Sequence, residues 1–357
     1  MAGTADEVAK TIEIGLVLQG GGALGAYEYG GILALFDLMN EAEAAGRKVT
    51  LRVVTGVSIG AINAACIVGA KDRGDARARL AALWNDFMIK TPAFLPDALG
   101  ANFALYEVPH FYRFSPGWNW TYLYETSELL DTLRRRIDFV ALNGSDTAFV
   151  VTAVDVTSGE LTSFANHRVG EIAPTVIEPK HVLASGSLAP QFPCTQIGEG
   201  QNACYYWDGG LVDNTPLGAA IDAFTSEAGA EPILVVMNLF PLRAALPNSF
   251  VQVDDRVNQL RFGNRLSQDA HNAKRINDLL GTIEALVPYA PPEQQAFARA
   301  QLDRFTKVTT VEVTLSDDGT YADPAAFRDF SQQGIEQRRA RGYKTTRQAL
   351  DRVFAAQ

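Results

Sequence analysis

The sequence predicts a three-layer α/β/α fold with a mainly parallel central sheet, followed by a mostly helical C-terminal extension. Short apolar, β-branched runs alternate with helical patterns between residues 12 and 240, which is typical of parallel strands joined by crossover helices. After Pro241 the composition changes to polar helical segments. We therefore expect an α/β domain at residues 12–245 and an extension at residues 246–357.

The composition is that of a folded globular protein with a large core. Hydrophobic residues make up 47% of the 357 residues and charged residues 20%. The formal net charge of −10 argues against a nucleic-acid-binding protein, which needs basic clusters to contact phosphates. The three cysteines have no metal-ligand spacing, so we expect neither a zinc site nor a disulfide framework. Residues 1–10 do not resemble a secretory signal and no apolar run is long enough to span a bilayer, so we expect a cytoplasmic protein.

The first predicted strand, residues 12–18, ends in a glycine-rich loop. Residues 19–25 read Gln-Gly-Gly-Gly-Ala-Leu-Gly and lead into a helix over residues 26–40 with a broad apolar face. A glycine loop between a strand and a helix points backbone N–H groups at an anion, so a phosphate-binding loop is one interpretation. No Gly-Lys-Ser/Thr follows the glycines, which excludes a Walker loop.

The second predicted strand, residues 51–55, runs directly into Gly56-Val57-Ser58-Ile59-Gly60, and a helix of small residues follows from Ala61. A Gly-x-Ser-x-Gly turn holds its serine in a strained conformation at the carboxyl end of the sheet, and the flanking glycines avoid clashes with it. Ser58 is therefore a candidate nucleophile.

An aromatic, proline-punctuated segment follows at residues 90–124. It fits an irregular packed insertion, and it also fits a lid or an acyl-chain funnel, because aromatic concavities suit apolar ligands.

The remaining elements are expected in the following order. In the α/β domain we expect helices at residues 127–137, 179–190 and 216–224, and strands at residues 149–156, 160–165, 204–207 and 232–240. In the extension we expect helices at residues 251–286, 292–305 and 327–354, and a strand at residues 308–315 that could join an edge of the main sheet.

A serine nucleophile needs a base and a group that stabilises negative charge. The chain has four histidines, at His110, His167, His181 and His271. None has a recognisable catalytic setting. A triad through His271 would follow the Ser, Asp, His order of α/β-hydrolases, but its neighbours look like an exposed helix face.

The other candidate base is Asp208, which ends a predicted strand and is followed by Gly209 and Gly210. These glycines allow close backbone approach, so Asp208 could accept the proton of Ser58 directly. An ordinary Asp-Gly turn is the alternative.

Three blocks of this sequence together resemble the patatin-like phospholipase family: residues 20–27, 56–64 and 208–216, in the family's order. Residues 184–190 are similar to the family's segment ahead of the aspartate, and the resemblance covers roughly residues 12–245, which it implies form the catalytic domain. It implies a dyad in which Ser58 is the nucleophile and Asp208 the base. It also implies an oxyanion hole made by the backbone N–H groups of Gly20, Gly21, Gly22 and Ala23.

The same resemblance implies hydrolysis of lipid acyl esters, of phospholipase A or lysophospholipase type, without a metal or cofactor. The substrate would be an acyl lipid or ester, and contact with a membrane would be peripheral and driven by apolar residues. Many family members carry Arg or Lys where Leu24 stands, which leaves open how that change affects the oxyanion or an anionic head group. Residues 330–343 look like the C-terminal extension of some bacterial relatives.

Two other functions remain open on the sequence. Acyl transfer occurs on a related fold, although such enzymes typically carry Gly-His-Ser and this chain has Val57 before its serine. An inert acyl-lipid-binding or scaffold protein is the second alternative, and the intact Ser58 and Asp208 argue against it.

Overall fold

The computed structural model describes residues 11–89, 113–114, 121–227, 229–302, 305–315 and 327–355. Most of the predicted aromatic insertion, residues 90–112 and 115–120, lies outside these ranges, and so does His110. Of that insertion the structure describes a two-stranded antiparallel pair, β3 (Arg113–Phe114) with β4 (Tyr124–Glu125).

The core of the fold is an eight-stranded sheet of order β10-β9-β1-β2-β5-β8-β7, with β6 also paired to β5. The strands β10, β9, β1, β2 and β5 pair in parallel, whereas β6, β7 and β8 join through antiparallel pairs. Their bounds are β1 Ile12–Leu18, β2 Val49–Gly56, β5 Ala148–Asp155, β6 Leu161–Ala165, β7 Thr195–Ile197, β8 Cys204–Asp208, β9 Glu231–Asn238 and β10 Thr309–Thr314. The predicted mainly parallel α/β sheet is confirmed.

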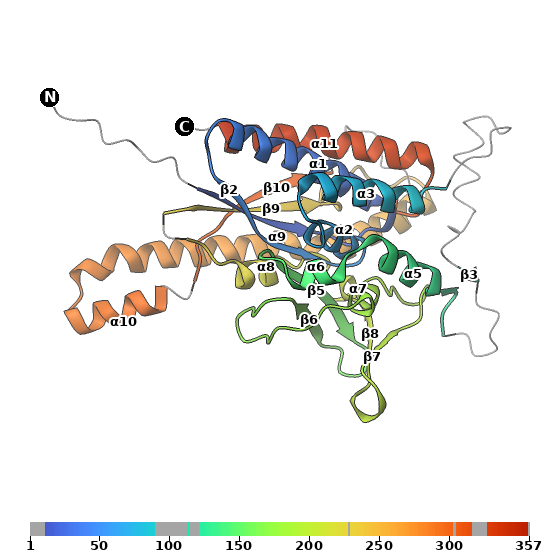
Figure 1. Cartoon of the computed structure of the whole chain (residues 1–357), viewed down its shortest axis with the longest axis horizontal. Helices are drawn as coiled ribbons and strands as arrows, with labels where there is room; N and C mark the ends of the chain where they lie inside the picture. The colour runs from blue at the N-terminus through green and yellow to red at the C-terminus, as the bar shows by residue number, and fades with distance from the viewer. Residues whose placement is uncertain are drawn as a thin grey trace.

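Helices cover both faces of this sheet (Figure 1). On one face lie α1 (Gly25–Ala44), α2 (Ile59–Val68), α3 (Arg73–Phe87) and α11 (Gln332–Ala355), and on the other α8 (Leu217–Ala223) and α9 (Phe250–Leu286). The other helices are α5 (Ser127–Arg136), α6 (Phe139–Asn143), α7 (Pro179–Ser185) and α10 (Pro292–Leu302), with short 3-10 turns η1 (Gly22–Leu24), η2 (Gly200–Asn202), η3 (Gly209–Leu211) and η4 (Val287–Tyr289).

The two helical layers follow from the alternation of side chains along the buried strands. In β1, Ile14, Leu16 and Leu18 belong to the apolar cluster under α1 and α11, whereas Val17 belongs to the cluster under α8 and α9. Every residue of β1 is buried, as expected for a central parallel strand.

Residues of the predicted extension complete this fold. β10 pairs with β9 in parallel at the edge of the sheet, and α11 lies along α1 (Figure 1). Small residues allow the close helix contact, since a side chain at Gly30 would overlap with the Arg339 carbonyl and one at Gly342 with the Tyr27 carbonyl. The Tyr27 hydroxyl also donates to Thr314 O at 2.9 Å. The predicted edge strand is confirmed, while the domain boundary at residues 245 and 246 stays a prediction.

Several elements differ from those expected. The helix expected at residues 179–190 ends at Ser185, and no element was expected at residues 139–143, which form α6, or at residues 195–197, which form β7. No element was expected at residues 73–87 either, and these form α3, capped by the Asp72 side chain, which accepts from the Asp75 N–H. The predicted helix at residues 327–354 begins only at Gln332, because Ser331 Oγ accepts from the Gly334 N–H and caps it. Within the described ranges, no helix combines the length and apolar character needed to cross a membrane.

Candidate active site

The glycine loop and the serine turn leave the sheet side by side, because they follow two neighbouring parallel strands. Leu18, the last residue of β1, lies opposite Gly56, the last residue of β2. In the next strand Val151 lies opposite Gly56, and Ala153 of the same strand pairs with Asp208 at the end of β8. The topology therefore brings three segments that are far apart in sequence to one edge of the sheet.

Ser58 has the strained backbone that its motif predicts. Its φ of 55° makes it the one non-glycine residue with a positive φ in the described part of the chain. A residue of this kind costs about 1–3 kcal/mol and persists only where its surroundings fix it. The Val57 N–H donates to Leu18 O at 3.3 Å, and the Ser58 N–H donates to Ser185 Oγ at 2.9 Å.

The glycines on each side of Ser58 lie against backbone atoms. A Cβ at Gly56 would lie 2.5 Å from the carbonyl carbon and oxygen of Gly60, and a Cβ at Gly60 would lie 2.5 Å from Leu18 O. Backbone atoms of the packed β1 and α2 cannot move aside for a side chain. The turn therefore requires glycine at both positions.

Asp208 lies next to Ser58 in a buried setting. It is 2% exposed, its Oδ1 accepts from the Gly210 N–H at 2.8 Å, and the Ser58 side chain is close enough to influence the pKa of its carboxyl group. Burial raises the pKa of Asp208 to about 7, and the Ser58 side chain and the bond from Gly210 oppose that rise. A carboxylate with such a pKa can gain or lose a proton near neutral pH.

The turn that ends α7 contacts both of these residues. Ser185 Oγ accepts from the Ser58 N–H, and Ser187 O accepts from the Asp208 N–H at 3.0 Å. Ser187 Oγ is in turn bonded to Leu183 O at 2.9 Å and to Thr195 Oγ1 at 2.8 Å. One short, buried segment thus fixes the backbone of the serine and of the aspartate, a role that nothing in its sequence predicts.

The glycine loop is held close to Ser58 by the segment after Asp208. Asn214 Nδ2 donates to Gly20 O at 3.0 Å, and a side chain at Gly20 would overlap with Asn214 and lie 3.0 Å from the Cβ of Ser58. Gly210 is equally restricted, because its Cβ would lie 2.7 Å from Asn214 Oδ1. Asn214 is thus a further site residue, within the block of residues 208–216 that resembles the family.

The N–H groups of the glycine loop divide into two sets. The Ala23 N–H donates to Phe327 O at 2.9 Å, and the Leu24 N–H donates to Gly21 O at 3.0 Å. Among the backbone bonds of the described chain outside its helices and strands, none comes from the N–H of Gly20, Gly21 or Gly22. Because the Ala23 N–H is already bonded to the Phe327 carbonyl, the candidate donors for the oxyanion hole are the N–H groups of Gly20, Gly21 and Gly22.

Leu24 and the described histidines lie outside this group of polar contacts. Leu24 is 6% exposed and packs in the main core cluster. His271 is exposed on α9, the His181 Nδ1 accepts from the Glu178 N–H at 2.9 Å, and the His167 Nε2 is 2.7 Å from Ser145 O. In the described structure none of these bonds involves Ser58 or Asp208, and no cluster of three His, Cys, Asp or Glu side chains is arranged to hold a metal ion.

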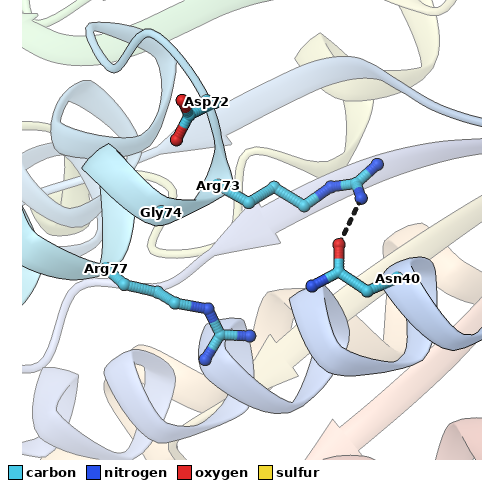
Figure 2. A pocket seen from close by; sticks show the side chains of 5 residues that line it. All are labelled: Asn40, Asp72, Arg73, Gly74 and Arg77. Carbon is cyan, nitrogen blue, oxygen red and sulfur yellow. Dashed lines mark hydrogen bonds between the residues drawn. The ribbon is translucent and has the colours of Figure 1, made fainter.

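A separate hollow of about 470 Å³ lies between α1 and the start of α3 (Figure 2). Its two arginines are paired with acids on α1, Arg73 with Glu43 and Arg77 with Asp37, and Arg73 also bonds Asn40 (Figure 2). The positive charges of both arginines are therefore already neutralised by acids of the same chain.

Comparison with known proteins gives a family and several similar folds. The profile of the family described as patatin-like phospholipase matches residues 16–221, more than half of the chain. No curated protein sequence matches the chain significantly.

Two bacterial proteins are among the solved structures that the chain resembles. VipD from Legionella pneumophila is 13% identical with a TM-score of 0.40, and the match covers 96% of this chain and 67% of VipD. ExoU, in its complex with SpcU from the type III secretion system of Pseudomonas aeruginosa, is 13% identical with a TM-score of 0.39. That match covers 98% of this chain and 53% of ExoU, so the chain spans about half of that protein.

Proposed function

This chain belongs to the patatin-like phospholipase family, and on that basis we propose that it is a lipid acyl hydrolase of phospholipase A or lysophospholipase type that works through Ser58 and Asp208. The observation that carries this proposal is the placement of Ser58, in a strained turn with φ of 55°, beside the buried carboxylate of Asp208, whose pKa the Ser58 side chain lowers. The pKa of Asp208 near 7 supports a role as general base at neutral pH.

The first half of the reaction transfers the acyl group to the enzyme. Asp208 accepts the hydroxyl proton as Ser58 Oγ attacks the ester carbonyl carbon. The N–H groups of Gly20, Gly21 and Gly22 stabilise the negative oxygen of the tetrahedral intermediate. The bond between carbon and the leaving oxygen then breaks, and Asp208 returns its proton to the departing alcohol. The product is an acyl ester of Ser58.

The second half releases the acid. A water molecule attacks the acyl carbon while Asp208 accepts one of its protons. The tetrahedral intermediate forms again against the glycine N–H groups, and its bond to Ser58 Oγ breaks as Asp208 protonates that oxygen. A free fatty acid leaves, and both residues return to their starting state. No residue other than Asp208 has to carry a proton in this sequence, which agrees with the bonds of His167 and His181, neither of which involves Ser58 or Asp208.

Exposed apolar side chains beside the site support peripheral contact with a lipid surface. Leu211 and Val212 directly follow the Asp208 loop and are 45% and 41% exposed. The Arg265 side chain of α9 donates to Val212 O at 3.1 Å and so ties this loop to that helix. Co-sedimentation with phosphatidylcholine vesicles tests this contact, which Leu211→Ser should weaken.

The central experiment assays the wild type beside Ser58→Ala, Asp208→Asn and His271→Ala on phospholipids, lysophospholipids and soluble esters. We expect the first two variants to lose activity by ~10³-fold or more, because they remove the nucleophile and the base. His271→Ala should stay within twofold of wild type.

Other outcomes would point to the remaining functions. A folded but inactive His271→Ala would replace the dyad with a triad. Faster acyl transfer to an alcohol or thiol than to water would favour an acyltransferase. Lipid binding without turnover, together with no labelling by a fluorophosphonate probe, would favour an inert binding protein.

A further inference from the structure

A short segment before α11 lies against the glycine loop. We call residues 327–331 the strap. Its first residue, Phe327, accepts the Ala23 N–H through its carbonyl at 2.9 Å. Near its other end, the Phe330 carbonyl accepts the Ile89 N–H at 2.8 Å, and Ser331 forms a parallel β-bridge with Ile89. The strap therefore connects the glycine loop to the chain just after α3.

The glycine loop is shaped to receive the strap. Gly22 has a φ of 54°, and a Cβ there would lie 2.5 Å from Phe327 O. Because the peptide between Gly22 and Ala23 is planar, the bond to Phe327 fixes the direction of that whole peptide. It thereby restricts ψ of Gly22 and φ of Ala23, at the end of the loop that carries the N–H groups of Gly20, Gly21 and Gly22. These are the donors proposed for the oxyanion.

Asp329 fastens the strap to α11. Its Oδ1 accepts from the Ser331 N–H at 3.0 Å, its Oδ2 lies 3.3 Å from Arg338 Nη1, and its side chain is almost fully buried. A side chain at Gly334, in the first turn of α11, would overlap with Asp329. The aspartate therefore fits closely against the start of the helix.

The strap is also anchored in the core. The Phe330 ring is buried and meets Phe87 of α3 edge-on, with ring centroids 6.4 Å apart. α11 itself lies along α1, the helix that follows the glycine loop (Figure 1). Both ends of the strap are thus fixed to elements that already surround the loop.

We propose that the strap positions the oxyanion loop, with Asp329 and Phe330 holding the Phe327 carbonyl against Ala23. These are positioning residues, since they act through the loop and contact no reacting atom. The inference rests on the proposed hydrolase function. It assigns a role in catalysis to a part of the predicted extension that is more than 260 residues from Ser58 in sequence.

The test separates positioning from folding by counting active sites. The variant Asp329→Ala removes the bonds that fasten the strap. The fraction of protein whose serine reacts is measured by intact mass at the end point of fluorophosphonate labelling. The kcat and KM for a soluble p-nitrophenyl ester are then expressed per reactive serine. We expect kcat per site to fall about 10–100-fold, because misplaced oxyanion donors cost transition-state stabilisation, with KM within twofold.

The matched control is Arg347→Ala. It removes the 2.7 Å ion pair from α11 to Glu41 on α1, at a point away from the strap. This variant should keep wild-type kcat per reactive serine. Asp329→Asn, which retains an oxygen for the Ser331 N–H, should recover most of the loss.

Wild-type kcat per site in Asp329→Ala would overturn the inference. If that variant is not recovered folded, Phe330→Leu decides in its place, with an expected loss of about 3–10-fold per site and the same overturning result. Failure of the proposed function looks different, since wild-type protein would then neither hydrolyse the ester nor react with the probe.

Discussion

The serine turn, residues 56–60, and the glycine loop, residues 20–24, leave neighbouring strands but are held in different ways. In the turn, the clashes that require glycine are with Leu18 and Gly60, which lie in or beside the same pair of strands. In the loop, the positive φ of Gly22 is matched by the carbonyl of Phe327, from the other end of the described chain.

This difference separates two requirements of the proposed chemistry. The conformation of the nucleophile is fixed by β1, β2 and α2 and by the bond to Ser185 of α7, so every element that fixes it lies within the first 185 residues. The conformation of the oxyanion loop depends on segments that follow much later, around Asn214 and Phe327. We infer that distant changes can reduce catalysis without displacing Ser58, and the following predictions test that separation.

The largest contrast is expected between alanine substitutions of two glycines. In Gly60→Ala the new Cβ would lie 2.5 Å from Leu18 O and 2.6 Å from Gln19 O, and neither backbone atom can move. We expect no folded protein, or a loss of activity above ~10³-fold. Gly22→Ala instead strains a positive φ and pushes on Phe327, which can shift, so we expect folded protein with kcat reduced about 10–100-fold.

Circular dichroism and kcat per reactive serine measure both effects. Gly218→Ala is the control, because a Cβ there meets nothing within 4 Å and α8 gains a better helix former. A fully active Gly60→Ala would remove the distinction between the two regions.

A pH effect of about 100-fold is expected between pH 8 and pH 5. Asp208, with a pKa of about 7, accepts the serine proton only as a carboxylate, so kcat/KM should fall about tenfold per unit below pH 7 and level off above it. Strap variants should lower the plateau of this profile without moving its midpoint. A profile that is flat from pH 5 to pH 8 would exclude Asp208 as the base.

The same pKa predicts a stability effect of opposite sign to that on activity. Because the folded state binds the proton of Asp208 more tightly than the unfolded state, the stabilising contribution of that proton is complete below pH ~4 and is lost as the pH rises to 7. The variant Asp208→Asn cannot ionise at this position. Its free energy of unfolding should therefore exceed that of wild type by on the order of 1–3 kcal/mol at pH 8 and by little at pH 4. Urea unfolding at the two pH values measures the difference.

The smallest effect is expected at the residue that holds the Ser58 N–H. Ser185→Ala removes the acceptor of that 2.9 Å bond and should lower kcat by about tenfold, since one buried hydrogen bond is lost at the nucleophile. Ser187→Ala is the matched control, because the Ser187 hydroxyl contacts Leu183 and Thr195 and not Ser58. Equal losses of kcat per reactive serine in the two variants would show that the Ser185 bond has no special role.

The sequence was most informative where structure depends on neighbours in the chain. The strand, turn and helix around Ser58 were predicted from a five-residue motif, because its strain and its glycines are local. α3 could have been predicted as well: Ala76, Leu80, Leu83 and Phe87 recur at helical spacing and are buried.

Other parts of the site have no such signal. Phe327 contributes a main-chain carbonyl, which every residue has, so no pattern of side chains marks it. Ser185 and Asn214 are polar residues in recognisable blocks, but only the fold shows that they contact Ser58 and Gly20. The catalytic roles of Ser58, Asp208 and the three loop glycines stay predictions until the variants are assayed.

The late position of the strap in the sequence also affects the timing of protein synthesis. At about 5–20 residues per second, a ribosome needs roughly 10–50 s to pass from Ser58 to Phe327. A nascent chain can thus fold the nucleophile turn long before the carbonyl that receives Ala23 has emerged. On the proposed mechanism, the growing chain would hydrolyse nearby lipids only slowly. Full hydrolytic activity would appear only once a chain that includes α11 has been released.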